Sequence, residues 1–79
     1  MNPSTRELTF GEKAVGLDFN VSGDPKITEV KQLYANVIDI ANDARKEVGP
    51  GEKARYYSTS ITYAEIACME AVKGITYKY

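Results

Sequence analysis

Residues 23–51 read GDPKITEVKQLYANVIDIANDARKEVGPG, and this stretch decides the fold. Asp24 can cap a helix, and Pro25 suits its first turn because proline lacks the amide hydrogen that this turn leaves unbonded. Apolar side chains then recur at the three- and four-residue spacing of a helix, at Ile27, Val30, Leu33, Tyr34, Val37, Ala41, Ala44 and Val48. Gly49-Pro50-Gly51 cannot continue the helix. The sequence therefore predicts a helix over about 25–48 and a chain reversal at 49–51.

A second helical pattern occupies residues 52 to about 77. Its inward positions are Ala54, Tyr57, Ser58, Ile61, Ala64, Cys68, Ala71, Val72 and Ile75. Because only a short turn separates the two patterns, the helices form an antiparallel hairpin. Each helix of about 24 residues measures about 36 Å. We expect one all-α domain over residues 1–79, shaped as a long, thin rod.

The N-terminal arm, about residues 1–23, is ambiguous. TFGEKAVG at 9–16 suits one helical turn with Thr9 as its cap, whereas Leu17, Phe19 and Val21 alternate as in extended chain. We expect a short helix followed by an extended arm that lies on the hairpin. In the alternative interpretation, the apolar side chains merely plug the open edge of the helix pair; these are Phe10, Val15, Leu17 and Phe19.

Apolar residues outside the two main stripes indicate self-association. They are Ile38 and Ile40 in the first helix, and Tyr63, Ile66 and Met69 in the second. This apolar arc is wider than one partner helix covers, and a chain of 79 residues builds only a marginal core by itself. One cysteine, Cys68, rules out an intrachain disulfide. We expect further copies of the chain to cover the exposed faces in a symmetric homo-oligomer.

Composition argues against several classes of function. With 10 basic and 11 acidic residues, the net charge of −1 lacks the broad positive field that DNA or an anionic membrane attracts. No apolar run approaches the roughly 18 residues of a membrane span, and MNPSTREL does not resemble a signal peptide. The absence of histidine argues against a metal site, a cofactor or an enzyme. We expect a cytoplasmic binding protein in which Cys68 is a reduced, apolar filler.

Phosphate binding is better supported, by SGDPKIT at residues 22–28. A loop that leads into a helix N-terminus favours anions, and Lys26 and Thr28 add a charge and a hydroxyl; the alternative is that Asp24 already caps those amides. The hairpin also brings basic, hydroxyl and aromatic residues to the same end, namely Lys73, Thr76, Tyr77 and Lys78, with Phe10, Lys13 and Phe19 of the arm nearby. Lys73 and Lys78 have the alternative role of complementing the helix dipole.

A second basic position lies near the other end of the hairpin. Arg55, with Tyr56, Tyr57 and Ser58, could form another site or an ion pair with Asp39, Asp43 or Glu47.

Two motifs give the chain a resemblance to a known family. FGEKAVGL-FN-SGD at residues 10–24 and AVK-IT at residues 71–76 resemble the small phage hairpin domain shared by the anti-CBASS cyclic-oligonucleotide sponges and the N-terminal part of the anti-Thoeris sponges. The resemblance covers residues 8–77. It implies an all-helical protomer that assembles as a hexamer in the cytoplasm of an infected bacterium.

The resemblance also implies a function and site residues. Such proteins bind cyclic dinucleotides, such as cyclic GMP-AMP, between paired protomers without cleaving them, and some hold cyclic trinucleotides around a threefold axis. The expected dinucleotide site comprises Phe10 for base stacking, Gly11 beside it, Lys13 and Lys26 for phosphate, and Gly23 and Thr28 near the helix start. Arg55 and Ser58 are expected at a trinucleotide site. The alternative function is a structural or protein-binding helical module.

Overall fold

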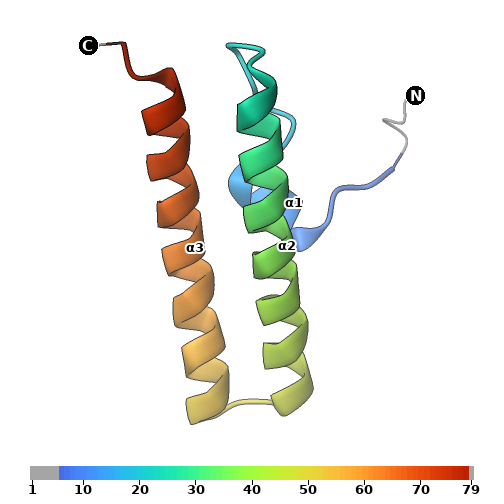
Figure 1. Cartoon of the computed structure of the whole chain (residues 1–79). Coiled ribbons are helices and arrows are strands. Elements are labelled where there is room, and N and C mark those ends of the chain that lie inside the picture. The colour runs from blue at the N-terminus through green and yellow to red at the C-terminus, as the bar shows by residue number, and fades with distance from the viewer. Residues whose placement is uncertain (1–5, 79) are drawn as a thin grey trace.

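The computed structural model describes residues 6–78 and contains three helices (Figure 1): α1 Phe10–Val15, α2 Pro25–Val48 and α3 Glu52–Thr76. Residues 6–78 contain no strand. α2 and α3 run antiparallel, so the start of α2 and the end of α3 lie at the same end of the hairpin. The all-α fold with a long helical hairpin, as predicted from the sequence, is confirmed, and both long helices end within one residue of their predicted limits. No helix in the described part of the chain is long and apolar enough to cross a membrane.

The buried face of α2 is rotated from the predicted one. Leu33, Val37 and Val48 belong to the predicted stripe, but they are 59%, 53% and 39% exposed. The positions that are buried are Ile27, Lys31, Ala35, Ile38, Ala41 and Asn42. The prediction is confirmed for Ile27 and Ala41 and wrong for Leu33, Val37 and Val48, because it followed apolar residues alone. Lys31 and Asn42 are buried instead, and Ile38, expected beside the stripe, lies in the core. On α3, the predicted positions Ile61, Ala64 and Cys68 are buried.

α1 is a single well-capped helical segment. The Thr9 hydroxyl accepts a hydrogen bond from the Glu12 amide, and the Glu12 carboxylate accepts one from the Thr9 amide. This reciprocal pair is a capping box, and it confirms the predicted Thr9 cap. At the other end, Gly16 takes the left-handed φ of 65°, which lets the Gly16 and Leu17 amides donate to the carbonyls of Lys13 and Glu12.

The segment after α1, residues 16–23, is not extended as predicted. Turns occur at 16–18 and 21–22, where the Phe19 amide donates to the Gly16 carbonyl and the Gly23 amide to the Asn20 carbonyl. The left-handed φ of Gly16 and Gly23 breaks the alternation that suggested a strand. Phe19 is 71% exposed, so its ring does not plug the hairpin edge, whereas Val15 packs against the core.

α1 approaches the backbone of α2 closely at Gly11. The Gly11 amide donates to Asp39 Oδ1 at 2.6 Å. A Cβ atom at residue 11 would lie 2.1 Å from the Ala35 carbonyl oxygen, which is far inside van der Waals contact. Glycine at position 11 therefore sets how α1 docks on α2. Gly11 has this packing role within the chain, and its expected place at a ligand site stays a prediction.

We predict that Gly11→Ala lowers the free energy of unfolding by about 1–3 kcal/mol, because the added methyl group forces α1 away from Ala35. Urea denaturation followed by circular dichroism measures this change. Gly74→Ala is the matched control, since Gly74 lies on α3 and a Cβ atom there meets nothing within 4 Å. Helix propensity predicts a gain of about 0.5–1 kcal/mol for the control. Equal effects of the two substitutions would contradict the docking role of Gly11.

Candidate functional site

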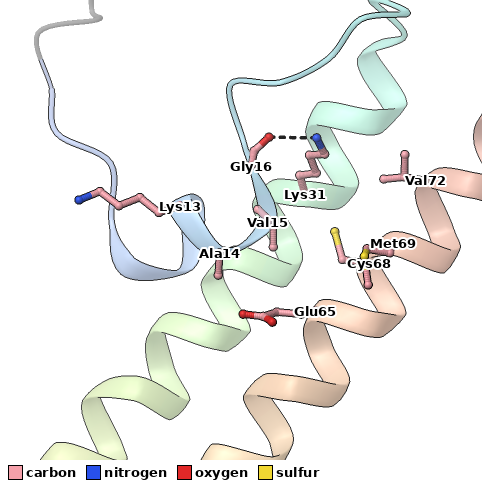
Figure 2. Close-up of a pocket in the computed structure, with 9 residues that line it drawn as sticks. All are labelled: Lys13, Ala14, Val15, Gly16, Lys31, Glu65, Cys68, Met69 and Val72. Carbon is pink, nitrogen blue, oxygen red and sulfur yellow. Dashed lines mark hydrogen bonds between the residues drawn. The ribbon is translucent and has the colours of Figure 1, made fainter.

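Two neighbouring grooves run along the seam between the N-terminal segment and the hairpin. The first groove, of about 450 Å³, lies between α1 and the middle of α3 (Figure 2) and is lined by Lys13, Ala14, Val15, Gly16, Lys31, Glu65, Cys68, Met69 and Val72. The second groove, of about 410 Å³, lies at the open end of the hairpin and is lined by Phe19, Asn20, Val21, Ser22, Ile27, Lys31, Val72, Thr76 and Lys78. Lys31 and Val72 line both.

The first groove is mainly apolar. Figure 2 shows the Lys13 side chain extending away from the other lining residues, and its ammonium lies 3.6 Å from Glu7 Oε2. Burial raises the pKa of the Cys68 thiol, and the nearby positive charge of Lys31 opposes this only in part. The thiol is therefore neutral at pH 7 and acts as an apolar wall. Lys13, expected to bind phosphate, does not project into this groove.

The second groove combines basic, polar and aromatic groups. Its lining contains two lysines, Lys31 and Lys78, and no carboxylate. Hydroxyl and amide groups come from Ser22, Thr76 and Asn20, and the exposed Phe19 ring offers a stacking face. As the sequence analysis expected, the arm and the end of α3 meet at this end of the hairpin. The groove is locally positive although the whole chain carries a net charge of −1.

The amides at the start of α2 are already bonded within the chain. The Asp24 carboxylate accepts a hydrogen bond from the Lys26 amide at 2.8 Å, so the capping alternative holds. The Gly23 amide donates to Asn20 Oδ1, and Asn20 Nδ2 donates to the Thr28 hydroxyl oxygen. A ligand at this helix start could therefore contact the exposed Lys26 side chain and the O–H of Thr28.

Phe10 and Gly11 lie far from the start of α2. They sit against Asp39 and Arg45, and Asp39 is 11 positions, or about 16 Å, along α2 from Thr28. One chain therefore does not bring the six expected dinucleotide residues into one pocket. Gly23, Lys26 and Thr28 form one group, and Phe10 and Gly11 form another.

Arg45 joins the three helices, and the sequence analysis missed it. Its guanidinium lies 5.5 Å from the centre of the Phe10 ring, and it donates to Asn42 Oδ1 and the Ser58 hydroxyl, each at 3.0 Å. Ser58, expected at a trinucleotide site, is thus engaged with α2. Arg55 does not share this contact: it pairs with Glu52 on its own helix, rather than with Asp39, Asp43 or Glu47.

Glu12 is a second group that the sequence analysis missed. It is 4% exposed and accepts hydrogen bonds from Arg6, the Thr9 amide and Gln32. These hydrogen bonds lower the pKa of the Glu12 carboxyl to about 2. The Arg6 guanidinium has the largest effect, and the Thr9 amide has the next largest. The three-residue spacing of Thr9 and Glu12, typical of a capping box, is the sequence signal that could have identified Glu12.

Nothing in the described residues suggests a metal centre, since no group of three or more His, Cys, Asp or Glu side chains gathers there. Comparison of the chain with protein-family models, with curated proteins and with solved structures finds no match.

We predict that the stabilising effect of Glu12 fades in acid. Its folded pKa of about 2 lies below the ordinary 4.5, so its stabilisation is complete above about pH 5 and is lost as pH falls toward 2. Glu12→Gln should therefore be less stable than wild type by about 1–2 kcal/mol at pH 7, and the difference should shrink toward pH 2. Urea titrations at several pH values and one protein concentration measure this, with the exposed Glu29→Gln as control. A difference that is constant with pH would contradict the assignment.

Proposed function

We propose that this protein is a sponge that binds cyclic oligonucleotide immune signals without cleaving them, and that it thereby blocks CBASS-type antiphage defence in the cytoplasm of an infected bacterium. The observation that carries the proposal is the second groove, which combines the Lys78 ammonium, the exposed Phe19 ring and hydroxyl and amide groups without any carboxylate in its lining. Lysine ammonium groups suit phosphodiesters, and aromatic rings stack on bases. The motifs at 10–24 and 71–76 supply the arm and the α3 end of this groove.

Assembly of several copies is part of the proposal. The outer face of α2 carries Leu33, Val37 and Ile40 at helical spacing, and these side chains are 59%, 53% and 70% exposed. A contiguous apolar face of this kind is typical of a protein interface. Because Phe10 lies far from Thr28 within one chain, a pocket that uses both needs two protomers. We propose a symmetric hexamer whose seams complete the dinucleotide sites, with cyclic trinucleotides at a separate site near Ser58.

Sequestration rather than cleavage is part of the proposal, and the side chains at hand support it. Hydrolysis of a phosphodiester calls for an acid-base group or a metal ion beside the bond. The second groove has neither a carboxylate nor a histidine in its lining. In the proposal, the Lys78 ammonium binds phosphate, while the Lys31 ammonium stays bonded to carbonyls of the chain itself. Recovery of unaltered ligand after digestion of the protein with a proteinase would establish this point.

A structural or protein-binding module is the second candidate function. The exposed apolar face of α2 favours it, since the same side chains could grip another protein. Under this alternative, replacing the lysines of the second groove leaves function unchanged, whereas replacing the apolar face abolishes it.

We predict that isothermal titration detects cyclic GMP-AMP binding and that Lys78→Ala weakens it at least tenfold, through loss of a charge-assisted contact to phosphate. Lys26 lies outside the groove lining, so Lys26→Ala tests separately whether the start of α2 contacts phosphate. Lys46→Ala is the control, because Lys46 lies in the last turn of α2 at the opposite end of the hairpin. Cyclic triadenylate is titrated in parallel. Absence of binding to every cyclic oligonucleotide at micromolar protein would overturn the proposed function, and equal losses in all three variants would reject the assigned groove.

We predict that sedimentation velocity shows an oligomer of about six chains for wild type and monomers for Ile40→Glu, because the carboxylate cannot be buried at an apolar seam. Ile40→Val keeps the face apolar and should keep the assembly. Circular dichroism of each variant checks that the helices remain. A wild-type chain that stays monomeric and folded would remove the pockets between protomers.

A further inference from the structure

Lys31 is a buried lysine within a short apolar stripe of α2. It is 7% exposed and lies one turn from Ile27 and from Ala35, both of which are core residues. Its ammonium donates to the Gly16 carbonyl at 2.9 Å and to the Phe19 carbonyl, and it lies 5.8 Å from the centre of the Phe19 ring. None of the described carboxylates forms an ion pair with it. The charge of Lys31 is therefore compensated by backbone carbonyls of residues 16–19.

Apolar burial contributes little to holding residues 16–23 in place, because Leu17 is the only one of the segment's three large apolar side chains that is half-buried. Phe19 and Val21 are 71% and 83% exposed. The segment's bonds to α2 are the two made by Lys31 and the contact of the Asn20 side chain with Thr28 and Asp24, which lies at the exposed start of the helix. Hydrogen bonds to a charged donor are about twice as strong as neutral ones. Lys31 is thus the principal tie between the segment and the hairpin.

Lys31 also stands between the two grooves. It lines both of them, with Gly16 in the wall of the first and residues 19–22 in the wall of the second. Figure 2 shows its ammonium bonded to the Gly16 carbonyl. If the segment left Lys31, the second groove would lose the wall that carries Phe19, Asn20 and Ser22. The flexible stem of Lys31 could then carry the ammonium out to water, so opening leaves no charge buried.

We infer that Lys31 is a positioning residue, a latch whose ammonium holds residues 16–23 closed over α2 and so forms the wall of the second groove. The segment opens as a unit separate from the hairpin when the latch is removed. The consequence for ligand binding rests on the proposed function, whereas the consequence for the segment's own order does not.

Hydrogen exchange of the wild type and Lys31→Met, resolved by residue with nuclear magnetic resonance, tests the latch. The Phe19 and Gly23 amides, which close the two turns, should exchange at least tenfold faster in Lys31→Met, while the Ile38 and Ala64 amides in the hairpin change less than twofold. Lys31→Arg keeps charged donors and should stay within threefold of wild type. Lys26→Met, an exposed lysine on the same helix, is the control. Unchanged Phe19 and Gly23 amides, or equal acceleration throughout the chain, would overturn the inference.

A second variant separates the ammonium from the aromatic ring. Phe19→Ala removes the ring but keeps the carbonyl that Lys31 bonds, so the Gly23 amide should exchange at nearly the wild-type rate. Acceleration equal to that of Lys31→Met would show that ring packing closes the segment, and the latch would be rejected. If wild type binds cyclic GMP-AMP, Lys31→Met should weaken binding at least fivefold. A wild type that binds none overturns the proposed function, and the exchange rates then decide the latch alone.

Discussion

Polar side chains of α2 hold the N-terminal segment on the hairpin, and the candidate site exists because of them. Asp39 binds the Gly11 amide at one end of α1, Gln32 contacts the buried Glu12, and Lys31 binds the carbonyls beyond the other end. Such bonds are directional, so they fix where the segment lies once Ala14 and Val15 pack against the core. Both grooves are spaces between this segment and α3, and their walls depend on its position.

The same arrangement explains how a nearly neutral chain offers a positive groove. Glu12 faces Arg6 and Asp39 faces the Gly11 amide, so these two acidic groups are engaged away from the second groove. Lys31 and Lys78 remain at the groove, where no lining residue is acidic. Local charge, rather than the field of the whole molecule, is what a small phosphodiester experiences when it is held close to the Lys78 ammonium. A small phosphodiester therefore needs only this local charge, whereas a long polyanion such as DNA needs a broad positive surface.

The outer face of α2 links the fold to the proposed assembly. Lys31 and Asn42 take buried positions whose polar groups are hydrogen-bonded within the chain, so Leu33, Val37 and Ile40 are left facing solvent. The interior in turn is made of Ile38 surrounded by alanines and Ile61, which lets α2 and α3 pack closely but buries little apolar area. A small interior with an apolar exterior is the pattern expected of a subunit that completes its burial against other copies.

Helix identity and helix ends were readable from the sequence, because Asp24-Pro25, Thr9 and Gly49-Pro50-Gly51 act through local backbone chemistry that needs no distant partner. The gathering of basic, hydroxyl and aromatic groups at the open end also followed from the hairpin. The rotation of α2 did not, because Lys31 and Asn42 are buried only where carbonyls and Arg45 satisfy them. The role of Gly11 likewise depends on the Ala35 carbonyl brought to it by the fold. Local interactions thus set the elements, and partners distant in sequence decided which residues are buried and which line the grooves.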